Sequence, residues 1–308
     1  MKDIAIIILN YNSSDFTLSC VRSILENSNS GLTYGVVVVD NHSCQEEFEK
    51  LKPLEGREDI QIIRNPYNSG FGGGNMDGIR GCQSNYYFFL NNDTRLLNDN
   101  LAILHGFMEK NPSAGVCSGQ MYLEGGSRGI NISFIPDLKV KLLGPWLLRL
   151  FAPEEFPGNK TRYDSPVRVP VLNGSSLFVR ASAFDQAGGF DTTFFLYCEE
   201  EDLAIRMKNS GYSCHLVPEA RFLHYGGKSS GESLETKFLH LKEFYISQHY
   251  LYRKHFGAFP AWVWRLTQFF RSLRKFYKDG KYFNLAFFIL FRTTFRNSLR
   301  FREKNNLA

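Results

Sequence analysis

The sequence lacks the cysteine pattern of a zinc or disulfide framework. Its six cysteines are scattered along the chain, with no C-x-x-C pair and no histidine cluster at the spacing that a zinc site requires. This absence argues against a zinc module and against a disulfide-stabilised secreted domain. We expect six reduced thiols.

Long hydrophobic runs are also absent. The longest uncharged apolar stretches, 256–264 and 285–291, fall well short of the roughly 20 residues that a helix needs to span a bilayer. The first residues form too short an apolar run for a signal peptide, and no small-residue cleavage site follows them. We therefore expect a cytoplasmic protein without a membrane-spanning helix.

Two signatures of nucleotide-dependent enzymes are missing. No G-x-G-x-x-G follows the first predicted strand, which disfavours a dinucleotide-dependent dehydrogenase. Residues 10–14 contain no Lys, Arg or Gly, so the basic, glycine-rich triphosphate loop of a nucleotidyltransferase is absent as well. The glycines at 70 and 72–74 come after the third predicted strand, where we expect a loop that lets the chain approach a nucleotide closely.

What is present is enough apolar surface for a folded domain and an uneven distribution of charge. Hydrophobic residues make up 43% of the 308-residue chain, which argues against disorder. From residue 237 to the C-terminus, 15 Lys and Arg face only three acids, a balance of +12, whereas the rest of the chain is acidic. The basic segment points to an anionic surface as its partner, and nucleic acid is disfavoured because the acidic body would repel phosphates.

Two amphipathic helices are predicted in this basic segment. One apolar stripe at helical spacing runs from Trp262 to Tyr277 and a second from Phe283 to Phe291, with basic residues such as Lys278 off the stripes. Such stripes either pack as core or lie in a membrane interface, and the excess positive charge favours the membrane. We predict a catalytic domain at 1–235, with halves at about 1–122 and 123–235, and a membrane-associating segment at 236–308.

The pattern of the first 120 residues is that of a parallel α/β sheet. Four aliphatic or aromatic runs predict buried strands, at residues 4–9, 36–39, 60–63 and 86–90. Later segments predict an irregular insertion at 123–170, a strand at 171–179, a helix from about 203 and a short strand at 214–217. We expect an α/β fold with a mostly parallel central sheet flanked by helices, and a ligand at the carboxyl ends of its strands.

Acidic side chains stand at two strand ends and in one later cluster. Asp40 and Asp93 follow the second and fourth predicted strands, so their loops should converge on one cleft. In such a cleft, one carboxylate would hydrogen-bond to the base or ribose of a nucleotide, and the other would hold a divalent cation against the diphosphate. The alternative is that either acid only caps a helix. The cluster 199–202 supplies a general base for an acceptor hydroxyl, or is an acidic helix N-terminus stabilised by the macrodipole.

Eight motifs in succession resemble one known family. Between Ile4 and Gly227 they read LNYNS, VVVDNHS, NSGFGGGN, FLNNDT, NGSSLFVR, GGFD, EEEDLAIR and PEARFLHYGG. Each motif is weak alone, but their order and spacing resemble glycosyltransferase family 2, whose fold is called GT-A. The resemblance is to its bacterial rhamnosyltransferase-like branch in particular, and it implies a GT-A fold for this chain, followed by the C-terminal amphipathic helices.

The resemblance also implies roles for individual residues. Asp40 would bind the nucleobase, and the other nucleotide-binding residues would be Tyr11, Asn12, Asn68, Gly70, Gly74, Asn75 and Asn92. Asp93 matches the metal-binding acid of the D-x-D motif, whose first position here is Asn91, and His224 matches a metal-binding histidine of some relatives. Glu200 takes the position of the catalytic base, where the family often has Asp, with Glu199 as the second candidate. The acceptor would be bound by Gly174, Ser175 and Asp202.

The implied reaction is an inverting, metal-dependent sugar transfer. The donor would be deoxythymidine diphosphate rhamnose, or second a uridine diphosphate hexose, with Mn²⁺ or Mg²⁺ as cofactor, and His224 favours Mn²⁺. The acceptor would be a lipid-linked saccharide or a polysaccharide of the bacterial surface, and the enzyme would sit peripherally on the inner face of the cell membrane. The alternative is a nucleotide-binding scaffold of a glycan assembly complex without turnover.

Overall fold

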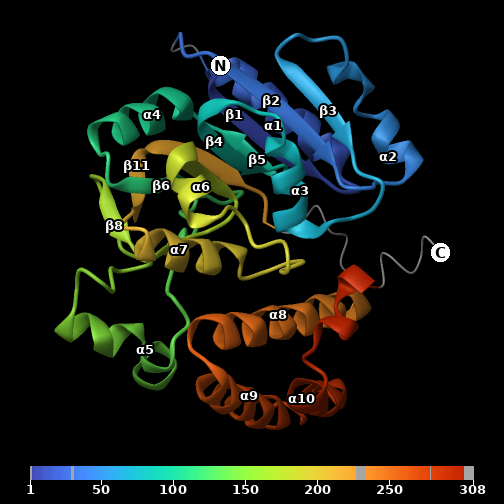
Figure 1. Cartoon of the computed structure of the whole chain (residues 1–308), viewed down its shortest axis with the longest axis vertical. Helices are drawn as coiled ribbons and strands as arrows, with labels where there is room; N and C mark the ends of the chain where they lie inside the picture. Colours follow the sequence, from blue (N-terminus) through green and yellow to red (C-terminus); the bar gives the residue numbers. More distant parts are fainter. Residues whose placement is uncertain (1, 29–30, 227–233, 278, 302–308) are drawn as a thin grey trace.

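The computed structural model describes residues 2–28, 31–226, 234–277 and 279–301 (Figure 1). Gly227 at the end of the last motif, Lys278 on the predicted basic face and residues 302–308 of the basic segment lie outside the described residues. Within the described part, the chain forms a twisted central sheet with helices on both faces, and a group of C-terminal helices at one end (Figure 1).

The central sheet has the strand order β3-β2-β1-β4-β10-β6-β11-β5, with β8 paired to β11. Its first four strands are parallel, as predicted, and β1, β2 and β4 are nearly continuous runs of buried residues, whereas β3 at the edge is only partly buried. Their bounds are β1 (Lys2–Asn10), β2 (Tyr34–Asp40), β3 (Ile60–Arg64) and β4 (Ser84–Asn91).

The second half of the sheet is mixed, but β6 and β11 run in the same direction as the first four strands, so the sheet is mostly parallel, as expected. Here β10 is antiparallel to both neighbours, β6 and β11 are parallel to each other, and β5 and β8 are antiparallel to β11. Their bounds are β5 (Thr94–Leu96), β6 (Ala114–Tyr122), β8 (Val167–Val169), β10 (Ser176–Arg180) and β11 (Ser213–His224). A separate pair is formed by β7 (Ile132–Ser133) and β9 (Val171–Leu172).

Helices bury both faces of the sheet. On one face, α1 (Ser14–Asn27) and α4 (Asn100–Lys110) pack against the side chains of one set of alternating strand positions. On the other, α3 (Gly70–Ile79), α6 (Ala181–Ala187) and α7 (Glu199–Asn209) cover the opposite set. The short α2 (Gln45–Glu49) and the 3-10 turn Lys52–Leu54 connect β2 to β3.

Several sequence expectations are corrected by the structure. The glycines from Gly70 onward are helical in α3 rather than a loop before a helix. The strand expected at 171–179 is divided into β9 and β10 by the turn 173–175, and the strand expected at 214–217 is the start of the longer β11. The insertion 123–170 contains β7, β8 and a helix, α5 (Leu138–Phe151), that begins at the capping residue Asp137 and is kinked at Gly144 and Pro145.

The C-terminal segment is helical. It consists of α8 (Leu234–His255), α9 (Ala258–Leu273), α10 (Lys281–Phe291) and a 3-10 turn, Phe295–Asn297, so both predicted helices are present. The unpredicted α8 joins them to the α/β part of the chain, because its Leu251 packs with Phe194 and Cys198 just before α7. Among the described residues, every helix is too short or too polar to cross a membrane.

Candidate active site

The carboxyl edge of the parallel strands brings most of the sequence-predicted residues into one row. Asn10 at the end of β1 is in register with Asp40 at the end of β2, and on the other side Leu9 is in register with Asn91 of β4. The row continues into β10, because the Asn91 backbone N–H donates to the Ser175 carbonyl at 2.9 Å. The loops after β1, β2 and β4 and the turn before β10 therefore meet at one edge.

Asp40 lies under this edge and has no exposed surface. Its carboxylate accepts hydrogen bonds from the Asn10 side-chain amide at 2.9 Å and from the Ser43 N–H at 3.2 Å, and the Arg64 Nε lies 3.5 Å away. The visible contacts of Asp40 thus fix the loops after β1 and β2 relative to each other. Direct contact between Asp40 and a nucleobase stays a prediction.

A buried polar network supports the same loops from below. The Asn92 amide donates to the Ser13 hydroxyl at 2.7 Å and to the Thr17 hydroxyl at 3.0 Å, and Thr17 in turn donates to Asn10. These groups are all buried, and a buried amide without partners would destabilise the fold. Asn92 therefore ties the loop after β4 to the start of α1.

Tyr11 and Asn12 lie at the outer side of the row. Tyr11 is exposed, and Asn12 adopts a left-handed conformation in which its side chain accepts from the Cys44 N–H at 2.8 Å. The non-glycine residues with positive φ among the described residues are Asn12, His42, Tyr197 and Cys198, and all four flank this edge or precede α7. Such backbone strain concentrates at functional sites, because surrounding contacts must hold it in place.

The glycines of α3 bring that helix close to other protein segments. A side chain at Gly70 would meet the Phe195 carbonyl at 2.2 Å, and one at Gly74 would meet the Leu9 side chain at 2.3 Å. Asn75 donates within its own helix to the Phe71 carbonyl, and Asn68 accepts from the Asn41 amide at 2.8 Å. The structure therefore accounts for Gly74 and Asn75 by packing, and does not bring these two to the open edge. A nucleotide contact for either one stays a prediction.

Asp93 and His224 come together at the turn between β4 and β5. Because β5 pairs with the end of β11, Thr94 is opposite His224, and the His224 Nε2 lies 3.2 Å from the Asp93 Oδ1. The two side chains are 5% and 16% exposed, so the pair faces the surface only through a narrow opening. The predicted metal ligands are thus neighbours, although 131 residues separate them in the sequence.

A carboxylate oxygen beside an imidazole nitrogen is a donor set that fits Mn²⁺ or Mg²⁺, with the imidazole favouring Mn²⁺. Within the described part of the chain, no group of three or more His, Cys, Asp or Glu side chains could hold a metal ion. Asp93 and His224 alone would therefore leave most coordination positions to other oxygen donors. Diphosphate oxygens and water are ligands of that kind.

Glu200 stands in the first turn of α7, beside the turn before β10. The Gly174 N–H donates to the Glu200 Oε1 at 3.3 Å, and burial raises the pKa of this carboxyl above its ordinary value. The side chain is partly exposed, so a ligand can reach it. A partly exposed carboxyl with a raised pKa is a stronger base than an ordinary glutamate.

Glu199 differs from its neighbour in access. It is 1% exposed, and its Oε1 has no hydrogen-bond partner among the described residues. Burial first, and then the charge of Glu200, raise the pKa of Glu199 well above the ordinary glutamate value. The sequence left both residues open as the base, and the geometry favours Glu200, because only this carboxylate is partly exposed and also bonded to the turn at Gly174.

Asp202 is fully buried and surrounded by cations. Its carboxylate contacts Arg206 of the same helix, and Lys254 and His255 at the end of α8, at 2.6 and 2.7 Å for the latter two. Burial raises the pKa of Asp202, but the hydrogen bond from His255 and the charge of Arg206 outweigh it, so the pKa is lowered overall. These contacts join α7 to α8, and acceptor binding by Asp202 stays a prediction.

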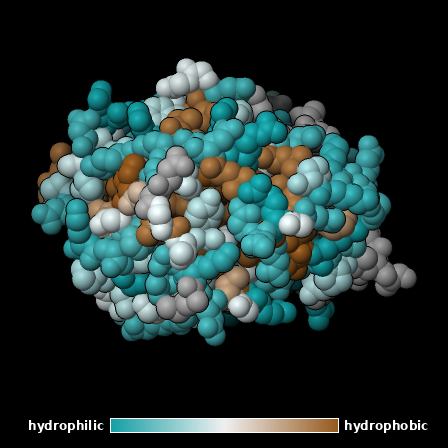
Figure 2. Space-filling view, turned by 90° about the horizontal axis from the view of Figure 1, so that it is seen from above, coloured by the Kyte–Doolittle hydropathy of each residue, from teal (hydrophilic) through white to brown (hydrophobic). Residues whose placement is uncertain are grey.

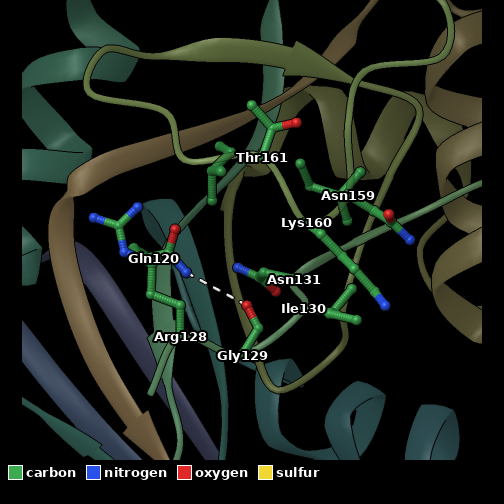
Figure 3. A pocket seen from close by; sticks show the side chains of 10 residues that line it. Gln120, Arg128, Gly129, Ile130, Asn131, Asn159, Lys160 and Thr161 are labelled. Atoms are coloured by element: carbon green, nitrogen blue, oxygen red, sulfur yellow. Dashed lines mark hydrogen bonds between the residues drawn. The ribbon is translucent and has the colours of Figure 1, made fainter. Parts of the chain in front are cut away.

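A cavity of about 270 Å³ lies among residues of β6, β7, β11 and the segment 159–161 (Figure 3). The cations Arg128 and Lys160 and the amides of Gln120 and Asn131 line it, and Figure 3 shows Asn131 between Gln120 and Lys160. The Asn131 carbonyl accepts from the Asn173 N–H at 3.0 Å, which connects the cavity wall to the segment that contacts Glu200. Gly174 and Ser175, predicted to bind the acceptor, directly follow Asn173 in this segment.

Some residues of this region escaped the sequence analysis. Asn10 and Ser43 hold Asp40 in place, Asn41 accepts from Asn65 and Ser69 ahead of α3, and Asn131 lies in the cavity wall. The sequence signal that could have found them is a polar residue at the end of a buried strand, such as Asn10 at the end of β1. This signal indicates that the residue lies at the carboxyl edge of the sheet, but it does not indicate which partner its side chain binds.

Comparison with known proteins identifies the family to which this geometry belongs. The model of the family described as "Glycosyl transferase family 2" matches residues 5–160, half of the chain. An N-acetylglucosaminyl-diphospho-decaprenol L-rhamnosyltransferase of Mycobacterium tuberculosis is 38% identical over 113 residues, which are 35% of this chain and 36% of that protein. Rhamnosyltransferase WbbL of Escherichia coli is 37% identical over 82 residues, 26% of this chain and 30% of that protein. The matched segment thus spans about a third of the length of these curated relatives.

Solved structures support the fold. The structure of GalNAc-T7 with UDP, GalNAc and Mn²⁺ superposes with a TM-score of 0.60 at 16% identity, covering 82% of this chain and 50% of that one. S. aureus TarS superposes with a TM-score of 0.54 at 12% identity, covering 89% of this chain and 43% of that one. At this level of identity the likeness concerns the fold, which is the GT-A fold expected from the motifs.

Proposed function

This chain belongs to glycosyl transferase family 2, a family of glycosyltransferase enzymes with rhamnosyltransferases among its relatives, and we propose that it is an inverting sugar transferase. The donor is a nucleoside diphosphate sugar, first deoxythymidine diphosphate rhamnose and second a uridine diphosphate hexose. The acceptor is a hydroxyl of a lipid-linked saccharide or polysaccharide. Rhamnosyltransferase activity in the named relatives, one of which acts on a diphospho-decaprenol according to its name, supports this choice.

One observation carries the proposal. Glu200 is bonded to Gly174, Ser175 is bonded to Asn91, and two residues further on Asp93 contacts His224. A base and a cation-binding pair therefore stand on either side of a single turn at the carboxyl edge of the sheet. A sugar donor at this turn would have its diphosphate on the side of Asp93 and its reacting carbon toward Glu200.

The reaction follows from these positions. Glu200 accepts the proton of the acceptor hydroxyl while the acceptor oxygen bonds to the anomeric carbon of the donor sugar. The bond between that carbon and the diphosphate breaks in the same step, and the nucleoside diphosphate leaves with the bonding electrons. Attack and departure occur on opposite faces of the carbon, so the configuration inverts without a covalent intermediate.

We propose that Asp93 and His224 hold Mn²⁺ or Mg²⁺, as the Mn²⁺ named with the GT-A structure of GalNAc-T7 suggests. The bound cation would neutralise the charge that develops on the departing diphosphate. Tyr11, Asn12, Asn68, Gly70 and Asn92 are proposed to line the nucleotide, with Asp40 supporting their loops. Gly174, Ser175 and the cavity at Asn131 are proposed to bind the acceptor.

The test is turnover of a panel of nucleotide sugars with and without Mn²⁺. We expect metal-dependent transfer, or slow donor hydrolysis when acceptor is absent, and a loss of at least about 100-fold in Asp93→Asn or His224→Ala. Asp164→Asn is the matched control, because this acid is 77% exposed and forms a surface ion pair with Arg162. Normal turnover in both ligand variants would refute the metal assignment.

The alternative function, a nucleotide-binding scaffold, makes a different prediction in the same experiment. It would bind the nucleotide by calorimetry and give no product with any donor. The partly exposed, raised-pKa carboxyl of Glu200 favours the enzyme over the scaffold, since a binding protein gains nothing from a base at this position.

We further propose that the protein is cytoplasmic and lies peripherally on the inner face of the cell membrane. The catalytic domain is assigned to 1–235 and the membrane-associating segment to 236–308, with α8 as the connection. Support comes from the exposed aromatic residues of α9 and α10, including Trp262, Phe270 and Phe291, among basic residues. The buried faces of the same helices pack on α8 and on each other, so the apolar stripes serve both as core and as exposed surface.

A further inference from the structure

Helix α5 exposes large apolar side chains that no part of the described chain covers. Trp146 is 72% and Phe151 81% exposed, and Leu142, Leu143 and Leu150 are exposed as well. Trp146 and Leu150 are four residues apart after the kink at Gly144, so they lie on one side of the second part of the helix, and Leu142 and Leu143 are exposed just before the kink. None of the residues of α5 is fully buried. A soluble helix of this composition would normally bury such a face against its own domain.

The charges on α5 are all of one sign. Its sequence contains no Asp or Glu, and its cations are Lys139, Lys141 and Arg149. The exposed residues of α9 repeat this pattern, because α9 also contains no acid and carries Arg265 and Arg271. Large apolar side chains flanked by cations and free of acids complement a surface that is anionic outside and apolar beneath.

The two helices form one surface. Leu138 at the start of α5 packs against the buried cluster of Tyr252, Ala261 and Trp264, which belongs to α8 and α9. Burial is the main cause that lowers the pKa of Lys141, and the charge of Arg271 on α9 adds to this effect because the two cations lie near each other. In Figure 1, α5, α9 and α10 lie together at the lower end of the molecule.

The opposite end of the molecule has a different character. Figure 2 views the protein from above, the end away from α9 and α10, and shows a mainly hydrophilic surface in which apolar residues appear between polar ones. The exposed aromatic residues of α9 and α10 and the apolar face of α5 therefore give the molecule one distinct end.

We propose that α5 is a membrane-inserting helix, and that Leu142, Leu143, Trp146, Leu150 and Phe151 enter the interface of an anionic bilayer beside α9 and α10. The kink at Gly144 and Pro145 and the length of α5 suit a helix that lies in the plane of the interface. Membrane insertion of α5 does not depend on the proposed sugar transfer. The consequence for a lipid-linked acceptor does rest on that proposed function.

That consequence follows from the connection of α5 to the site. Four residues separate the end of β7 from the start of α5, and β7 pairs with β9, which leads directly to Asn173 and Gly174. A bilayer bound by α5 would therefore lie on the acceptor side of Glu200. A diphosphate-linked lipid could remain in the membrane while its terminal sugar reaches the turn 173–175.

The experiment measures binding of the full chain to phosphatidylglycerol vesicles and uses the fluorescence of Trp146. In a Trp262→Phe background the remaining indole, Trp264, is only 1% exposed, so Trp146 is the tryptophan that responds to lipid. We expect vesicles to shift its emission to shorter wavelength and brominated acyl chains to quench it. The combined variant Leu143→Ser, Trp146→Ser and Phe151→Ser, in the native Trp262 background, should lose about 100-fold in vesicle partition while its unfolding midpoint stays unchanged.

The control variant is Leu97→Ser with Leu123→Ser, which removes two exposed apolar side chains outside α5. It should bind vesicles like the native protein. Undiminished vesicle binding by the α5 variant, or a dimer in light scattering that the same variant dissociates, would overturn the proposal. Donor hydrolysis measured without lipid separates this result from a failure of the proposed function, because the three substituted side chains, Leu143, Trp146 and Phe151, are exposed on the surface.

Discussion

Replacing Glu200 by Gln, with Glu199→Gln as its matched control, tests the assignment of the catalytic base. Glutamine has the shape of glutamate, and its oxygen can still accept the Gly174 N–H that now donates to Glu200 at 3.3 Å. The substitution therefore removes proton acceptance and little else. General base catalysis is worth about 100- to 10,000-fold, which corresponds to about 2.7–5.4 kcal/mol of activation free energy. We expect kcat to fall by this factor.

The control acts on the neighbouring residue, which is also a glutamate but is buried. Glu199→Gln removes a charge that burial and Glu200 disfavour, so the variant should keep kcat within about threefold and gain stability against urea at pH 8.

Burial raises the pKa of Glu200, so the native activity should fall as the pH drops through a value above that of an ordinary glutamate. Steady-state kinetics across pH would refute this reasoning if Glu199→Gln, and not Glu200→Gln, abolished both turnover and the acidic limb of the profile.

Three further predictions concern buried acids. Asp202→Ala should lower the free energy of unfolding by about 3–5 kcal/mol in urea titration, because Lys254 and its neighbours would lose their counter-charge; a loss below about 1 kcal/mol would contradict the assigned contacts. Asp40→Ala should weaken nucleotide diphosphate binding in calorimetry and cost about 2–4 kcal/mol of stability, since the Asn10 amide and the Ser43 N–H lose their acceptor; unchanged affinity would count against a role at the nucleotide. Burial, and then repulsion by Glu200, raise the pKa of Glu201 to about 8, so the protein should lose stability as the pH rises from the ordinary glutamate pKa through that value. Glu201→Gln should flatten this decline in stability. Melting temperatures that fall equally with pH in both proteins would exclude the prediction.

The parallel half of the fold could be predicted from sequence because its signals are local. Continuous apolar runs give β1 to β4, and helical spacing gives α1, α9 and α10. The antiparallel half could not be predicted in this way. The pairing of β5 with β11 joins residues far apart in the chain. The break at 173–175 combines a local hydrogen bond, from the Ser175 N–H to the Asn173 side chain, with the distant contact of the Asn173 N–H with the Asn131 carbonyl.

The candidate site follows the same division. Strand ends placed Asp40 and Asp93 at one edge, but the resemblance to a family was needed to assign His224 and Glu200. The sequence could not predict which of the two glutamates a ligand can reach. Glu199 and Glu200 are chemically identical and differ only in how α7 orients them relative to Gly174. Helix α5 was expected to be irregular, since its Gly144 and Pro145 interrupt the pattern that would have revealed it.

The contacts of Asp202 have a mechanical consequence. The proposed base, Glu200, lies in the first turn of α7. Two residues later, Asp202 forms ion pairs with Lys254 and His255 at the C-terminal end of the 22-residue α8. A tilt of α8 relative to the sheet would pull on the first turn of α7 directly. An enzyme built in this way could sense whether its C-terminal helices are seated, and turnover on vesicles would then exceed turnover in solution even for a donor and acceptor that never touch lipid.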